Sequence, residues 1–124
     1  MNRLKILLVE DDRVSLMVYK KMLESWNYEV FHASDGFLAL QMLQEQRFDL
    51  MISDNQLPFM NGTELVEKAN EINAAMPALI LTGNNPDDVK TSDIVAVLQK
   101  PVLPNYFRHH IQAAITNSRF RKIA

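Results

Sequence analysis

The segment from Phe48 to Asp54 constrains the fold of this chain more than any other feature. It is short and almost continuously apolar, which predicts a β-strand buried on both faces and therefore covered by helices on both sides. The strand cannot extend much further, because Pro58 lacks a backbone donor and the Asn61-Gly62 pair favours a turn. Asp54 is thus expected at the carboxyl end of a central strand, where open α/β sheets bind their ligands.

Four further apolar runs alternate with helical patterns along the chain. The predicted strands are 4–9, 28–33, 48–54, 78–82 and 95–99. The predicted helices are about 14–26, 38–46, 63–73 and 104–118, and the polar segment 84–93 is expected to hold at most a short helix from Pro86. This alternation predicts an α/β fold with a doubly wound, five-stranded parallel sheet and right-handed crossovers.

Helical periodicity also predicts which side chains each helix buries. The predicted inner faces are Val14, Met17, Val18, Met22 and Trp26 in the first helix, Leu38, Ala39, Met42 and Leu43 in the second, Leu65, Val66, Ala69 and Ile72 in the third, and Phe107, Ile111, Ala114 and Ile115 in the last. Asn27 is expected to end the first helix in a left-handed conformation.

Composition narrows the possible functions. The 124 residues suit one domain spanning 1–124, and the net charge of −2 offers no basic surface for nucleic acid or an anionic membrane. The absence of cysteine excludes disulfides, thiolate metal sites and thiol nucleophiles. The longest apolar run, 94–98, is far shorter than the roughly 20 residues that a transmembrane helix needs. We therefore expect a cytoplasmic protein, with 119–124 as a solvated helix end or a connection to a further domain.

Polar side chains follow four of the predicted strands. Asp11 and Asp12 follow the first, Asp54 ends the third, Thr82 ends the fourth and Lys100 follows the fifth. Because the carboxyl ends of parallel strands share one edge of the sheet, we expect all five side chains to meet there. Clustered carboxylates repel one another unless a cation lies among them, and an oxygen-only site suits Mg²⁺ or Mn²⁺.

A site of this kind suits a phosphoryl group. Asp54 would be the nucleophile, since an aspartate can accept a phosphoryl group as an acyl phosphate. The divalent cation and Lys100 would neutralise the phosphoryl oxygens, and the Thr82 hydroxyl would donate a hydrogen bond to one of them. Backbone amides near Asn55 and Gly83 are expected to contribute further hydrogen bonds.

The same positions resemble the receiver domains of two-component response regulators. The resemblance extends from Leu4 to about Ser118 and rests on the acidic pair Asp11-Asp12, the phosphoacceptor Asp54, the segment from Pro58 to Gly62, Thr82, and Lys100-Pro101. It implies a flavodoxin-like sheet in the order 2-1-3-4-5 and a phosphoacceptor switch rather than an enzyme. The implied donor is a sensor histidine kinase or a histidine phosphotransfer protein, and the implied output is an effector protein or an attached domain.

The resemblance implies finer details as well. Asp12, Asp54 and the Gln56 carbonyl would bind the metal, Asp11 would act through water, and the Lys100-Pro101 bond would be cis. Gln56, like Asn84, is a neutral amide that can hydrogen-bond water but cannot deprotonate it, so we expect the acyl phosphate to decay without a dedicated base.

Two departures from the family concern the region before Lys100. The family usually has Tyr or Phe three residues before the lysine, where this chain has Val97, and Lys100 lies only 18 positions after Thr82. We therefore expect a short or irregular helix before the fifth strand. The coupling of phosphorylation to that surface is expected to differ from the family's usual one.

Three other functions can be weighed against the phosphoacceptor switch. A Mg-dependent phosphohydrolase would need a second acid two residues after Asp54, and Gln56 occupies that position. A receiver-like binding module with altered or lost phosphorylation coupling fits Val97 and the short connection, although the phosphorylation residues are all present. A flavin carrier of similar topology is disfavoured, because acids fill 10–12, where a flavin phosphate would need amides and hydroxyls.

Overall fold

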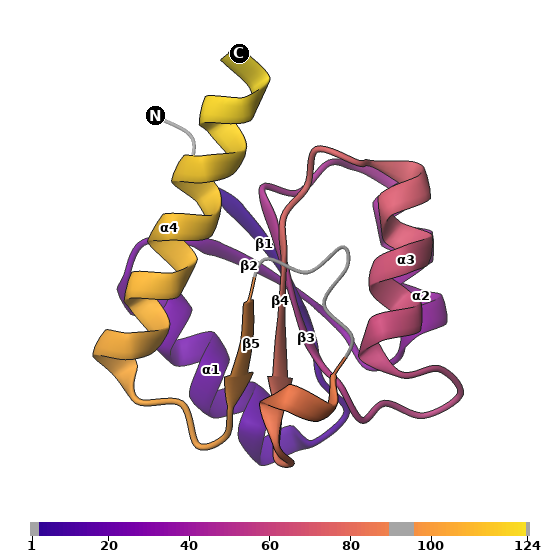
Figure 1. Ribbon diagram of the computed structural model, residues 1–124, viewed down its shortest axis with the longest axis vertical. Helices are drawn as coiled ribbons and strands as arrows, with labels where there is room; N and C mark the ends of the chain where they lie inside the picture. Colours follow the sequence, from indigo (N-terminus) through magenta and orange to yellow (C-terminus); the bar gives the residue numbers. More distant parts are fainter. Residues whose placement is uncertain (1–2, 90–95, 124) are drawn as a thin grey trace.

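The predicted alternation of strands and helices is present in the computed structural model, which describes residues 3–89 and 96–123, with side chains up to residue 118 (Figure 1). In chain order the elements are β1 (Lys5–Val9), α1 (Arg13–Ser25), β2 (Glu29–Ala33), α2 (Gly36–Glu45), β3 (Leu50–Asp54), α3 (Gly62–Ile72), β4 (Ala78–Thr82), the 3₁₀ helix η1 (Pro86–Asp88), β5 (Ala96–Gln99) and α4 (Pro104–Ile123). Most ends lie within two residues of their predicted positions, and α4 continues beyond the predicted end at Ser118.

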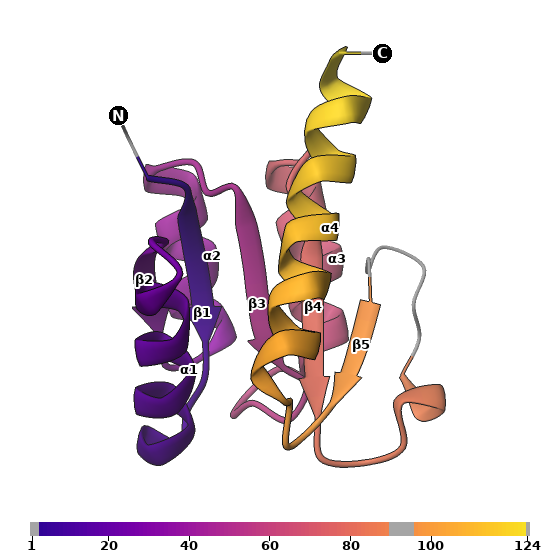
Figure 2. The same cartoon turned by 90° about the vertical axis from the view of Figure 1, so that its left-hand side faces the viewer.

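The five strands form one sheet in the order β2-β1-β3-β4-β5, and every neighbouring pair is parallel. This confirms the predicted doubly wound, flavodoxin-like fold. The central strands β3 and β4 are buried along their whole length, as their continuous apolar runs predicted. Because every neighbouring pair is parallel, the strands all end at the same edge of the sheet, and Figure 2 shows the arrowheads of β1, β4 and β5 pointing to it. The residues that follow the strands therefore gather at that edge.

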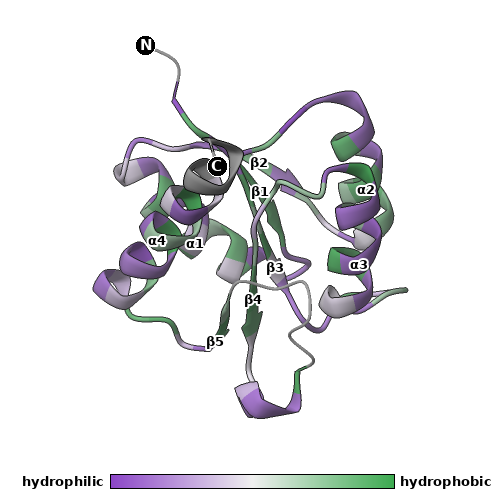
Figure 3. Ribbon diagram, turned by 45° about the horizontal axis from the view of Figure 1, so that its top comes forward, coloured by the Kyte–Doolittle hydropathy of each residue, from purple (hydrophilic) through white to green (hydrophobic). Residues whose placement is uncertain are grey.

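Helices cover both faces of the sheet. One core lies under α1 and α4 and includes Ile6, Leu50 and Phe107, whereas the other lies under α2 and α3 and includes Leu7 and Met51. The strands therefore supply alternate side chains to the two cores, because successive residues of a strand point to opposite faces. Figure 3 shows mostly green, apolar strands at the centre of the molecule, between helices on which purple and green segments alternate.

Side-chain caps set the starting points of three helices. Asp12 accepts a hydrogen bond from the Ser15 amide at the start of α1, and Asp35 accepts one from the Leu38 amide at the start of α2. Asn61 caps α3 in the same way. These caps satisfy amides that have no partner inside the helix, so each helix begins at the residue that follows its cap.

The predicted inner faces are partly wrong. Val14, Met17 and Val18 are exposed, and α1 instead buries Tyr19 and Leu23. Leu38 and Ile72 are also exposed, whereas all four predicted inner residues of the last helix are buried. The apolar stripe of α1 is wider than its contact with the sheet. The orientation of α1 on the sheet decides which of these apolar residues are buried.

The described part of the connection between β4 and β5 holds only the short helix η1, as predicted from Pro86. The remainder of the predicted polar segment, 90–93, lies outside the described residues. Lys100-Pro101 is a cis peptide bond, as the family resemblance implied, and Asn27 has a positive φ of 69°, as predicted for a left-handed helix terminator. Across the described ranges, no helix has both the length and the apolar character needed to cross a membrane.

The packing around Gly62 predicts a large penalty for a side chain there. A Cβ atom on Gly62 would lie 2.8 Å from the Asp54 carbonyl oxygen and 2.9 Å from Ile80 Cδ1. We expect Gly62→Ala to lower the free energy of unfolding by about 1–3 kcal/mol, because the backbone at Asp54 cannot move aside cheaply. Urea denaturation measures this change.

Gly83→Ala is the matched control for this experiment. No atom lies within 4 Å of a Cβ built on Gly83, and its φ is not positive. Its unfolding free energy should stay within about 0.5 kcal/mol of the wild-type value. Equal losses in the two variants would contradict the packing described for Gly62.

Candidate functional site

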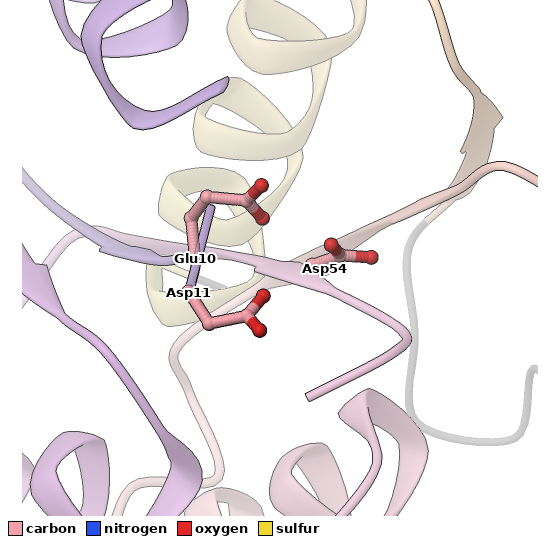
Figure 4. A group of neighbouring side chains, drawn as sticks. All are labelled: Glu10, Asp11 and Asp54. Carbon is pink, nitrogen blue, oxygen red and sulfur yellow. The ribbon is translucent and has the colours of Figure 1, made fainter. Parts of the chain in front are cut away.

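Three carboxylates converge at the carboxyl edge of the sheet. Glu10 and Asp11 directly follow β1, and Asp54 is the last residue of β3. One oxygen atom from each lies within 4.8 Å of the others, and Figure 4 shows the three side chains gathered at this edge. The convergence follows from the sheet order, because β1 and β3 are adjacent parallel strands whose ends meet.

Burial makes this acidic cluster energetically costly. Glu10 is only 2% exposed and Asp54 only 8% exposed, whereas Asp11 is open to solvent. The Glu10 Oε1 atom is buried without a hydrogen-bond partner. Burial and the neighbouring Asp54 carboxylate raise the pKa of Glu10 to about 7, although Lys100 opposes this shift. A negative charge on Glu10 is therefore unfavourable in this site unless further positive charge enters.

Lys100 supplies the positive charge of the site. Its Nζ atom lies 2.9 Å from Asp54 Oδ2 and 3.5 Å from Glu10 Oε1. Burial acts to lower the pKa of Lys100, but the Asp54 and Glu10 carboxylates outweigh it, so the net shift is upward. Lys100 is also fixed through its backbone, since its amide donates to the Thr82 carbonyl. The structure thus brings Lys100 to Asp54, as predicted.

Backbone and hydroxyl groups complete the surroundings of Asp54. The Gln56 amide donates to Asp54 Oδ1 at 3.1 Å. Thr82 is fully buried, and its Oγ1 accepts a hydrogen bond from the Asn84 amide, which leaves the hydroxyl hydrogen available to donate. Gly83, which directly follows β4, is exposed.

The two amides that follow Asp54 have different partners. The Asn55 amide donates to the Leu81 carbonyl at 2.8 Å and thus continues the pairing of β3 with β4. The amide that contacts the Asp54 carboxylate belongs to Gln56 instead. Asn55 thus pairs with β4 one residue beyond the end of β3. Because successive amides of an extended chain point to opposite sides, the next amide, that of Gln56, faces the site.

The acidic pair is placed one residue too late in the sequence analysis. Asp12 does not join the acidic cluster; its side chain caps α1 by accepting from the Ser15 amide, a bond that lowers the pKa of Asp12. Glu10, which was not predicted as a site residue, joins the cluster in its place. The sequence does contain a signal for Glu10. The apolar run of β1 ends at Val9, so Glu10 and Asp11 are the two acids nearest to the end of the strand.

The donor set fits a hard divalent cation. Three carboxylates provide oxygen atoms only, and one of these atoms is buried without a hydrogen bond. Lys100, the ammonium group that contacts the cluster within the described part of the chain, carries one positive charge. Oxygen-only sites of this size favour Mg²⁺ or Mn²⁺ over metals that prefer sulfur or imidazole. Glu10, Asp11 and Asp54 are the residues that could hold such an ion.

The sequence pattern of the response regulator receiver domain matches residues 6–112. The chain belongs to the receiver domain family.

Relatives of this receiver domain differ greatly in length. It is 37% identical over 102 residues to the response regulator receiver protein CpdR of Brucella abortus (strain 2308), covering 78% of this chain and 84% of CpdR. It is also 37% identical over 82 residues to the sensor protein EvgS of Escherichia coli (strain K12), covering 66% of this chain but only 7% of EvgS. The same fold unit therefore occurs in some relatives as most of the protein and in others as a small part of it.

Solved structures support the same assignment. This receiver domain superposes on a CheY-like receiver domain protein of Methanospirillum hungatei JF-1 with a TM-score of 0.87 and 28% identity, covering 97% of this chain and 99% of the other. The receiver domain of the sensor histidine kinase PA1611 of Pseudomonas aeruginosa PAO1 gives a TM-score of 0.80 with 25% identity, covering 93% and 99%. That structure contains a magnesium ion coordinated in its active-site cleft.

The position of the acidic cluster predicts that Asp11 matters more for metal binding than Asp12. Asp11→Asn should weaken Mg²⁺ binding by about tenfold or more, because it removes a charged oxygen ligand. Asp12→Asn should change the affinity by less than about threefold, since asparagine still caps α1. The rise in Tm with increasing Mg²⁺ concentration measures both affinities. A larger loss in Asp12→Asn than in Asp11→Asn would contradict the assigned cluster.

Proposed function

We propose that this chain is a phosphoacceptor switch in which Asp54 receives a phosphoryl group from a phosphohistidine. The donor would be a sensor histidine kinase or a histidine phosphotransfer protein in the cytoplasm, and residues 1–124 would act as one receiver domain. The observation that carries the proposal is the contact of the Lys100 ammonium with Asp54 inside a group of three carboxylates. Membership of the receiver family, and relatives that include a sensor protein, support the same reaction.

The proposed reaction transfers the phosphoryl group from nitrogen to oxygen. A carboxylate oxygen of Asp54 attacks the phosphorus, and the phosphorus–nitrogen bond breaks with its electron pair going to the imidazole nitrogen. The imidazole leaves as a neutral group when its other nitrogen already carries a proton. The product is an acyl phosphate on Asp54 and a free histidine on the donor.

Groups of this chain would stabilise the charge that the phosphoryl oxygens carry. The Lys100 ammonium would move from the Asp54 carboxylate to a phosphoryl oxygen, and the Gln56 amide and the Thr82 hydroxyl would donate hydrogen bonds. Gly83 would add a backbone amide. A Mg²⁺ or Mn²⁺ ion would neutralise further negative charge in the site when bound.

We propose a specific set of metal ligands that corrects the set inferred from sequence. Asp11 and Asp54 would bind the ion with the Gln56 carbonyl, and Glu10 would complete the acidic cluster, directly or through water. Asp12 is left out, because its carboxylate caps α1. The buried Oε1 atom of Glu10 supports a cation here, because it accepts no hydrogen bond and its one ion-pair contact, to Lys100 at 3.5 Å, is long.

Loss of the phosphoryl group would proceed by attack of water without a dedicated base. Gln56 and Asn84 are both exposed amides close in sequence to the site, and an amide can orient a water molecule but cannot remove its proton. Water would add to the acyl phosphate, and inorganic phosphate and the free Asp54 carboxylate would be released.

The output surface would lie beside Lys100. A groove of about 380 Å³ is lined by residues that include Val97, Pro101, Leu103 and Tyr106. We propose that movement of Lys100 toward the phosphoryl group changes this groove, which an effector protein or an attached domain would read. Val97 replaces the family's usual aromatic residue and packs on the core under α2 and α3, so this coupling would depend on loop movement rather than rotation of a ring.

Phosphorylation by a small donor tests the proposed function directly. In the presence of Mg²⁺ and phosphoramidate, the protein should gain the mass of one phosphoryl group by intact-mass measurement. Asp54→Asn, or chelation of the metal, should abolish the gain, whereas Asp88→Asn on the exposed helix η1 should leave it unchanged. Unchanged phosphorylation of Asp54→Asn would reject Asp54 as the acceptor.

The contact of Lys100 predicts a second effect. Lys100→Met should slow phosphorylation by phosphoramidate by about 10²-fold, because it removes one charged donor to the phosphoryl oxygens. Its Mg²⁺ affinity should not fall, since no carboxylate is lost. The initial rate of mass gain measures the first effect and the Mg²⁺-dependent Tm measures the second. Lys68→Met, on the exposed surface of α3, is the matched control, and a wild-type rate in Lys100→Met would contradict the assigned role.

A further inference from the structure

Phe59 adopts a backbone conformation that a bulky residue rarely takes. Its φ is +72°, and the Met60 amide donates to the Pro58 carbonyl at 2.9 Å across it. A three-residue turn with positive φ at its centre is the strained form of the γ-turn, and an aromatic side chain at positive φ is a steric outlier. The ring is nevertheless 82% exposed, so burial of the side chain does not offset the strain.

The loop that carries Phe59 is anchored firmly on both sides. The Met60 side chain is buried and packs so closely on Gly36 that a Cβ there would lie 2.6 Å from Met60 Cγ. The Gly62 amide donates to the Asn55 carbonyl at 2.8 Å and closes the loop. Anchors of this kind can maintain a strained turn, and they hold the Phe59 ring outward.

A second exposed aromatic ring lies beside Phe59. Phe37, in the first turn of α2, is 59% exposed, and its ring centroid is 6.4 Å from that of Phe59. We call Phe37 and Phe59 the aromatic pair. Clustered exposed aromatic rings are characteristic of protein contact surfaces, and a strained exposed residue points to a function outside the fold itself.

The aromatic pair lies at the same edge of the sheet as Asp54. Phe59 belongs to the loop that leaves Asp54, and Phe37 directly follows the start of α2 at that edge. Across the sheet, Val14 and Met17 near the start of α1 are 69% and 58% exposed. A phosphohistidine that reaches the 8%-exposed Asp54 must therefore bring its carrier into contact with this edge.

The charge around the same edge indicates the chemistry of the carrier. Exposed acids outside the acidic cluster follow both β1 and β4, namely Asp12, Asp87 and Asp88, while Arg13 is the exposed base that follows β1. Complementary charge steers partners and fixes their orientation. A partner for this edge would have an apolar centre for the aromatic rings and Lys or Arg residues around it.

We propose that the aromatic pair is a docking contact for the protein that donates the phosphoryl group, with an apolar centre and a basic rim on the donor. This inference rests on the proposed phosphoacceptor function. It assigns Phe59 and Phe37 to recognition of the donor protein and gives them no part in the chemistry at Asp54. Phosphorylation by a small donor needs no docking surface, so its rate is the reference against which transfer from a protein donor is compared.

Phe59→Gly separates recognition from folding and from chemistry. Glycine adopts positive φ without strain, so the Tm of the variant should equal or exceed that of the wild type. A panel of autophosphorylated histidine kinase and phosphotransfer domains first identifies the protein that phosphorylates the wild type fastest. Transfer from this donor to Phe59→Gly should slow by about tenfold or more, as for loss of an aromatic contact residue. Phosphorylation by phosphoramidate should stay within about twofold of the wild-type rate.

Two further variants make the result specific. Phe37→Ala should slow transfer from the protein donor in the same way, whereas Ile72→Ala, an exposed apolar residue at the far end of α3, should not. Raising the salt concentration should slow transfer from the protein donor and leave phosphoramidate uptake nearly unchanged.

The possible failures are distinguishable. Wild-type transfer rates in Phe59→Gly, or self-association of the wild type that is lost in this variant without any change in transfer, would overturn the docking inference. Uptake from phosphoramidate with no transfer from any protein donor would also overturn it, while leaving Asp54 as phosphoacceptor. Failure of phosphoramidate itself to phosphorylate the wild type would count against the proposed function instead.

Discussion

Electrostatic repulsion among Glu10, Asp11 and Asp54 is the constraint on which the rest of the structure depends. Their oxygen atoms lie within 4.8 Å of one another, two of the three side chains are almost fully buried, and Lys100 offers one positive charge in return. Such a group is stable only because the surrounding sheet holds the strand ends together, and it gains most when further positive charge enters. The same imbalance makes the site receptive to a divalent cation.

The parallel sheet is what creates this imbalance. Adjacent strands β1 and β3 end at the same level, so the residues after them face each other across one strand spacing. Lys100 arrives from β5, and its amide bonds to the Thr82 carbonyl at the end of β4. No single segment contains the site. Each strand end contributes one or two groups, and the apolar cores on both faces fix their distances.

The edge of the sheet combines this buried charge with exposed apolar groups. The strained turn at Phe59 and the uncovered part of α1 border the acidic cluster on opposite faces of the sheet. Apolar side chains left open near a polar cleft provide surface that a partner can cover. The acidic cluster and the exposed apolar surface thus share one edge of the sheet.

The sequence by itself determined the alternation of strands and helices, the parallel sheet and the meeting of Asp54, Thr82 and Lys100 at one edge. Hydrophobic periodicity is a local property, and the ends of parallel strands share one edge whatever their order. Only the tertiary structure decided that Glu10 rather than Asp12 joins Asp54, and that Val14 and Met17 are exposed. An acid next to a strand can face the site or cap the following helix, and the competing hydrogen bonds decide between them. A helix with a wide apolar stripe likewise buries only what its neighbours can reach, and that depends on packing rather than on spacing along the chain.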